Sequence, residues 1–191
     1  MICYTTSTTE KDLLSILSLQ KINLANTLTK QEIETEGFVT VSHNINALTK
    51  LNNIENHIIA KDDDTVIDYL LAMTYQSKFE VPILTPMFNV FDKVLFANKP
   101  ISTYNYIVVG QACISKAYRG QGVLDKCYAT YKEHFMLKYD FAITEIASTN
   151  LRSMKAHKRI GFEEISSYTS PDGTDWRVVL WNWKNIAKAV I

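Results

Sequence analysis

The sequence has neither net charge nor a long hydrophobic run. Its 20 basic and 20 acidic residues balance, so no overall field exists to attract a nucleic acid or an anionic membrane. The start of the chain lacks a basic segment followed by an apolar stretch, and the longest apolar runs fall short of the roughly 20 residues that span a membrane. We therefore expect a cytoplasmic protein without a nucleic-acid or membrane partner. Any anion that the protein binds must be held by a local group of residues.

Cysteine is scarce, and its spacing excludes a disulfide framework and a thiol-based metal site. The three cysteines are far apart and odd in number: Cys3, Cys113 and Cys127. Three histidines also lack metal-ligand spacing: His43, His57 and His134. We expect reduced thiols and no metal. A covalent acyl-cysteine is disfavoured, because Cys113 and Cys127 have no histidine nearby in the sequence.

Low-complexity tracts, internal repeats and Gly/Ser linkers are also missing, so one domain over residues 1–191 is expected. The composition, 47% hydrophobic and 21% charged, is typical of a packed globular protein.

The N-terminal half is predicted to alternate extended and helical segments. In chain order these are a strand (2–8), a helix (10–22), a short helix closed by Gly37, an extended segment (38–43), a helix (44–54) and two strands within 57–73 joined by an acidic turn (62–64). Three of the four prolines, Pro82, Pro86 and Pro100, interrupt residues 75–100, which indicates broken helix and loop in place of strand.

The C-terminal half gives a clearer pattern. In chain order it predicts a strand (106–115), a helix (122–139), a strand (141–149), a helix (150–160) ended by Gly161, and two last strands joined by a turn at 171–173. This order of elements predicts a mixed α/β sheet with helices packed on it.

Two of only six glycines lie in the segment Ser115–Asp125, SKAYRGQGVLD, which joins a strand to a helix. The first backbone N–H groups of a helix have no internal partner and carry partial positive charge, so such a turn can bind an anion. Glycine at 120 and 122 allows an anion to approach the backbone closely, and Arg119 adds a full positive charge. The simpler interpretation is a tight turn only. Dinucleotide and nucleoside-triphosphate loops fit less well, because Asp125 replaces the third glycine and no Gly-Lys-Ser/Thr follows.

This turn and a second element downstream resemble the GNAT superfamily of N-acetyltransferases over residues 106–165. The cofactor turn of that family, Q/R-x-x-G-x-G/A, corresponds to Arg119, Gly122 and Leu124, with leucine in place of a small residue. The second element corresponds to Asn150, Ser153, His157, Gly161 and Phe162, with histidine in place of tyrosine.

The resemblance implies a GNAT-like α/β (α+β) fold, whose mixed, mostly antiparallel sheet has six to seven strands and helices on both faces. It implies acetyl-CoA as co-substrate. The backbone of Ala112, Cys113 and Ile114 would pair with the pantetheine arm beside an opened strand. Asn150, which is also expected to cap its helix, would lie near the pantetheine amides. The pyrophosphate would be held by the amides of Gly120, Gln121, Gly122, Val123 and Leu124.

Glu145 is the candidate general base. Attack on a thioester requires a neutral amine, and a lysine-like amine is neutral in only about 0.04% of molecules at pH 7. Glu145 shares the apolar side of its strand with Phe141, Ile143 and Ala147, and partial burial would raise its pKa. Some GNAT members that modify protein N-termini carry their base at a similar place. The alternatives are a carboxylate that ties the sheet to a neighbouring element, a solvated side chain and a water relay.

His157 takes the place of the tyrosine acid that the resemblance implies. The departing thiolate needs a proton, and an ordinary imidazole is protonated in about a quarter of molecules at pH 7. The alternative is a histidine that packs or hydrogen-bonds beside the cofactor.

The resemblance implies direct transfer of acetyl from acetyl-CoA to a primary amine. The alternative function is a non-catalytic acyl-CoA-binding or regulatory domain, and a homodimer is left open. The acceptor is not readable from the sequence. Two aromatic groups are candidates for its pocket, although the tryptophans are more typical of core and sheet edge: Trp176, Trp181 and Trp183, and Tyr75, Phe79, Phe88, Phe91 and Phe96.

Overall fold

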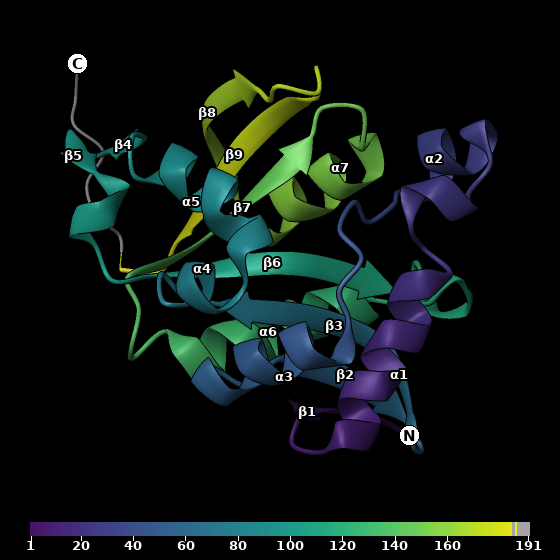
Figure 1. The fold of residues 1–191 in the computed structure, drawn as a ribbon. Coiled ribbons are helices and arrows are strands. Elements are labelled where there is room, and N and C mark those ends of the chain that lie inside the picture. Colours follow the sequence, from purple (N-terminus) through teal and green to yellow (C-terminus); the bar gives the residue numbers. More distant parts are fainter. Residues whose placement is uncertain (185, 187–191) are drawn as a thin grey trace.

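The computed structural model describes residues 1–184 and 186, in which seven strands form one twisted sheet in the order β1-β2-β3-β6-β7-β9-β8 (Figure 1). Their bounds are β1 Ile2–Thr6, β2 Ile58–Asp62, β3 Thr65–Met73, β6 Tyr106–Ile114, β7 Phe141–Ala147, β8 Glu163–Thr169 and β9 Asp175–Asn182. Strands β6 and β7 pair in parallel, and the other neighbours pair antiparallel. The predicted mixed, mostly antiparallel sheet is confirmed.

Helices cover both faces of the sheet. Their bounds are α1 Glu10–Lys21, α2 Lys30–Glu36, α3 Ile45–Ile54, α4 Ser77–Glu80, α5 Thr85–Phe91, α6 Val123–Phe135 and α7 Leu151–Ile160. Buried residues of α1, α3 and α5 pack with Tyr69 and Leu71 on one face, whereas those of α6 pack with Leu70 and Ala72 on the other. The alternation of side chains along β3 therefore supplies both cores.

Helix ends follow the capping residues of the sequence. Thr9 caps α1 in a capping box with Asp12, and Thr29 does the same for α2 with Glu32. Gly161, with a φ of 114°, ends α7 in a left-handed conformation. The predicted helix over 122–139 is too long, because α6 ends at Phe135 and the chain turns there.

One prediction in the first hundred residues needs correction, and one expected extended segment forms no strand. Residues 75–100 do contain broken helix, but they also hold a small hairpin of β4 Leu95–Phe96 and β5 Lys99–Pro100, whose turn residues Ala97 and Asn98 adopt positive φ. In the segment predicted as extended, 38–43, Val39 makes a single bridge to Leu24 and the rest is irregular. Side chains from distant elements bind the carbonyls of this segment and replace sheet pairing.

The feature that positions the site is the short pairing of β6 with β7. Register partners run only from Tyr106↔Phe141 to Val108↔Ile143, within the described residues, so the later parts of both strands lie apart. Along β6 the pairing with β3 also shifts between Val109 and Ala112, which marks a bulge. The sheet therefore opens beside the C-terminal half of β6, as expected from the resemblance.

Membrane insertion by a helix finds no support in the described part of the chain, where no helix is long and apolar enough to cross a bilayer.

Candidate functional site

A cavity of about 70 Å³ lies where β6 and β7 separate. Its walls come from the two strands, from residues 38–40, from the start of α7 and from Trp176 of β9. Glu145 of β7 and His157 of α7 both line this cavity, although they lie twelve positions apart in the sequence. The structure thus brings the two predicted proton-transfer residues to the wall of one cavity.

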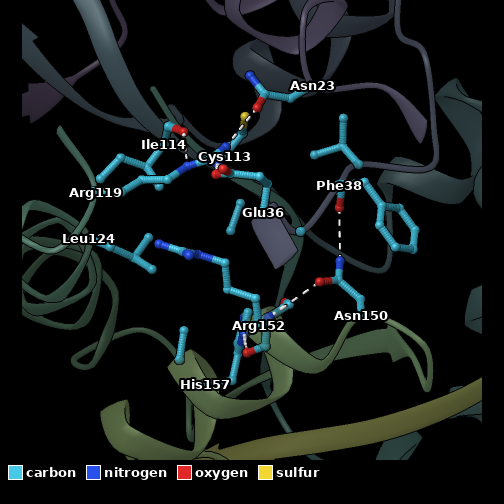
Figure 2. Close-up of a pocket in the computed structure, with 15 residues that line it drawn as sticks. Asn23, Glu36, Phe38, Cys113, Ile114, Arg119, Leu124, Asn150, Arg152 and His157 are labelled. Atoms are coloured by element: carbon cyan, nitrogen blue, oxygen red, sulfur yellow. Dashed lines mark hydrogen bonds and ion pairs between the residues drawn. The ribbon is translucent and has the colours of Figure 1, made fainter. Parts of the chain in front are cut away.

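A second cavity of about 90 Å³ adjoins the first and shares Asn150, Ser153 and His157 with it (Figure 2). It is lined by most of the residues predicted to hold the cofactor, from β6, the turn and α7: Ala112, Cys113, Ile114, Arg119, Leu124 and Asn150. The unpaired edge of β6 can therefore accept an extended chain of amides as an added strand does.

The turn before α6 has the conformation that its glycines permit. Gly120 and Gly122 have φ of 77° and 75°, and a methyl group at either would meet nothing within 4 Å. The positive φ, and not lack of space, thus requires glycine. Gln121 folds back so that its Nε2 donates to the Ala117 carbonyl at 2.8 Å. Helix α6 begins at Val123, directly after Gly122. Glycine has no side chain, so no side-chain hydrogen bond caps this helix.

A depression of about 370 Å³ surrounds this turn and the first turn of α6. Four basic side chains line it: Arg119, Arg152, Lys155 and Arg159. The last three lie on one face of α7 at i, i+3 and i+7, and the sequence motifs do not include them. Their helical spacing was the available signal, but only the packing of α7 beside the turn places them around this depression.

Arg119 is held by other groups of the protein. Its Nη1 lies 2.5 Å from Glu36 Oε2, its Nη2 donates to Asn23 Oδ1 at 2.8 Å, and its Nε donates to the Ile114 carbonyl at 3.2 Å. Only 11% of the side chain is exposed. The charge predicted to meet a phosphate is thus paired with a carboxylate in this structure (Figure 2).

Asn150 caps α7 as predicted. Its Oδ1 accepts from the Ser153 amide at 3.2 Å, and its Nδ2 donates to the Phe38 carbonyl at 2.9 Å. The side chain is buried between α7 and the loop after α2.

Glu145 has the electrostatic environment that a base at neutral pH needs. Burial raises its pKa to about 6, although the Tyr168 hydroxyl donates to its Oε2 at 2.6 Å and opposes the shift. At neutral pH the carboxyl is therefore ionised and can accept a proton.

His157 is buried, and burial lowers its pKa to about 4. Its Nδ1 lies 2.9 Å from the Ser153 carbonyl oxygen, which only accepts, so Nδ1 carries the proton of the neutral ring. The Tyr128 hydroxyl then donates to Nε2 at 2.6 Å. His157 is neutral at pH 7 with both nitrogens engaged, which departs from the quarter-protonated imidazole expected from the sequence.

Comparisons with known proteins rest on structure. No protein-family model matches the sequence, and no curated protein matches it. The fold is similar to that of a chain in the NatC complex bound to Gag peptide and CoA, with a TM-score of 0.64, 14% identity and coverage of 95% of this chain and 98% of that one. It is also similar to a GNAT-family acetyltransferase from Streptococcus agalactiae 2603, with a TM-score of 0.64, 12% identity and 95% coverage of both chains. The chain has the GNAT fold.

A third match to the GNAT fold is the ribosomal-protein-S18-alanine N-acetyltransferase from Escherichia coli. Here the TM-score is 0.62 and the identity 10%, over 100% of this chain and 99% of that chain. The similarity therefore extends to the N-terminal half, where the sequence offered only an order of elements.

Other candidate residues take structural places in the GNAT fold. Cys113 and Cys127 are buried thiols, and burial raises the pKa of both, to about 12 for Cys113, which opposes a thiolate nucleophile. Trp176 lines the cavity with Glu145, whereas Trp181 and Trp183 pack against α6.

The aromatic residues of 75–100 divide between the core and the surface, where Phe79 is exposed. Phe88, Phe91 and Phe96 are buried in the core, and Tyr75 lines a separate groove with Tyr104 and Tyr106. The proline-broken segment folds over one sheet face, because its phenylalanines complete that core.

Proposed function

We propose that this chain is an acyltransferase that moves the acetyl group of acetyl-CoA directly to a primary amine. One observation carries the proposal: the unpaired edge of β6, a carboxyl group with a pKa raised to about 6, and a glycine turn at a helix N-terminus beside basic side chains of α7 lie along adjoining cavities. The GNAT-fold neighbour with bound CoA supports the choice of cofactor.

The cofactor's diphosphate would lie at the amides of residues 120–124, beside the basic face of α7. Its pantetheine arm would run along residues 112–114, near Asn150. When bound, acetyl-CoA supplies the activated thioester. The near-neutral charge of the whole chain is compatible with this, because the anion meets a local array of dipoles and cations.

Glu145 would remove a proton from the acceptor ammonium. The resulting neutral amine would attack the thioester carbonyl, so that a C–N bond forms, the C–S bond breaks and the electron pair leaves on the CoA sulfur. The nitrogen then loses its second proton to that thiolate or to water, which leaves the neutral amide. The proton on Glu145 Oε can then pass to solvent. The walls formed by Phe38 and Trp176 would keep bulk water from the thioester.

The acid role of His157 stays a prediction. The neutral ring can give up only its Nδ1 proton, which faces Ser153, while Nε2 accepts a hydrogen bond from the Tyr128 hydroxyl. A thiolate whose conjugate thiol has a pKa near 8.5 can take its proton from water, so no acidic side chain is required. The geometry favours the alternative in which His157 packs between α6 and the cavity.

A binding module without catalysis is the second candidate, because His157 is neutral and Arg119 is already paired. The two functions separate in one experiment. Release of CoA thiol would be followed at saturating acetyl-CoA with small primary amines, lysine peptides and peptides with free N-termini. The last are included because one GNAT-fold neighbour has a bound Gag peptide and another is a ribosomal-protein-S18-alanine N-acetyltransferase. Amine-dependent release supports the acyltransferase, whereas calorimetric binding without release for every amine supports the module.

A further inference from the structure

The end of α2 and the loop after it cross the mouth of the proposed cofactor site. We call residues 36–43 the strap. Four of its residues, Glu36, Gly37, Phe38 and Val39, line the cavity that also contains the edge of β6 (Figure 2). Gly37 has a φ of 73°, and a methyl group there would come within 3.1 Å of Asn150 Oδ1. Glycine thus lets the strap lie close against the start of α7.

Polar contacts fix the strap along its length. Asn150 Nδ2 donates to the Phe38 carbonyl and Gln111 Nε2 donates to the Val41 carbonyl, each at 2.9 Å. At the far end the His43 amide donates to Gln20 Oε1 at 2.8 Å. Gln20 and Gln111 are themselves joined, with Gln20 Nε2 donating to Gln111 Oε1 at 2.8 Å.

The strap begins with a carboxylate placed between two cations of the phosphate turn. Glu36 lies 2.5 Å from Arg119 Nη1 and 3.1 Å from Lys116 Nζ. These cations hold the pKa of Glu36 below its usual value, so the carboxylate is charged at neutral pH. A carboxylate oxygen of the protein is therefore paired with the Arg119 guanidinium, which the motif predicts to bind a phosphate.

We propose that the strap is an autoinhibitory element that competes with acetyl-CoA, with Glu36 as the internal substitute for a cofactor phosphate. The inference rests on the proposed function. Acetyl-CoA would bind the fraction of molecules in which Glu36 has left Arg119 and Asn150 has left the Phe38 carbonyl. Its apparent dissociation constant is then raised by the reciprocal of that fraction.

The first test is calorimetric titration of acetyl-CoA into the full chain and into Glu36→Gln. The amide keeps the size of the side chain and removes the charge, so we expect binding about three- to tenfold tighter. Glu34→Gln is the matched control, because Glu34 is an exposed carboxylate of the same helix. It should change the dissociation constant less than about twofold by long-range charge alone.

Unchanged or weaker binding in Glu36→Gln would overturn the inference while leaving the proposed function intact. Absence of acetyl-CoA binding in all three proteins would overturn both.

Hydrogen exchange gives an independent readout. Competition predicts faster exchange of the strap amides, including that of Val39, which donates to the Asn23 carbonyl at 2.9 Å, once acetyl-CoA is added. Slower exchange would mean that the strap clamps on the cofactor, which contradicts the inference.

Discussion

At the scale of single residues, local motifs were readable and long-range partners were not. The glycines at 120 and 122 stood out in the sequence because their role depends on backbone conformation within one turn. The partners of Arg119 could not be foreseen, since Glu36 lies 83 positions away. The neutral state of His157 also depends on Tyr128, which another helix supplies.

Glu145 gives the sharpest prediction at this scale. Glu145→Gln should lower kcat about 100-fold or more, because the amide cannot accept the ammonium proton. The wild-type rate should rise with pH through about 6, as a carboxyl with raised pKa ionises, and this inflection should vanish in the variant. Steady-state CoA release against pH measures both effects.

Acetyl-CoA affinity should stay unchanged in Glu145→Gln. Glu133→Gln, an exposed carboxylate on α6, serves as the control and should keep both the rate and the inflection. A Glu145→Gln enzyme with wild-type turnover would assign this carboxylate to sheet structure, through its bond to Tyr168.

At the scale of elements, the sequence predicted the type and order of helices and strands well where capping residues and hydrophobic periodicity indicated the same element. Helices α1 and α7 begin and end close to their predicted capping residues. The segment 38–43, which was expected to be extended, forms no strand, because the Phe38 and Val41 carbonyls accept hydrogen bonds from the side chains of Asn150 and Gln111. The place where β6 leaves β7 depends on pairing across the sheet, which no local pattern encodes.

The basic face of α7 carries a prediction of its own. Changing Arg152 and Lys155 together to alanine should weaken acetyl-CoA binding about tenfold, because both line the depression at the phosphate turn. The loss should shrink at high salt, since exposed charges are screened. Calorimetry at two salt concentrations checks this.

Lys158→Ala is the matched control for the same helix, because Lys158 lines a different groove with Gly161 and Phe162. The control removes one charge and the double variant two, so a free-energy loss in the control about half that of the double variant would mean that net charge alone matters.

At the scale of the whole molecule, three buried histidines couple stability to pH. Burial lowers the pKa of His43 and His157 to about 4 and that of His57 to about 3. Below the unfolded pKa of about 6.5 the unfolded chain binds protons that the folded chain does not. The free energy of unfolding should therefore fall as pH drops from 7 toward 4.

His157→Phe isolates one of these contributions. A pKa shift from about 6.5 to 4 predicts that the loss of stability between pH 7 and pH 5 is about 2 kcal/mol smaller in the variant. Urea denaturation at the two pH values measures the difference. An identical pH dependence in both proteins would mean that His157 keeps the ordinary imidazole pKa of about 6.5 in the folded state, so that about a quarter of the rings would be protonated at pH 7 and available as an acid.

In the proposed complex, the backbone amides before α6 hold the diphosphate of acetyl-CoA. An NMR titration that follows the amide resonances of Gly120 and Gly122 as acetyl-CoA is added checks this contact. We expect these two resonances to shift strongly and to saturate together with the resonances of residues 112–114 on β6. Resonances at the turn that stay fixed while others move, or that stay fixed at millimolar acetyl-CoA, would contradict it.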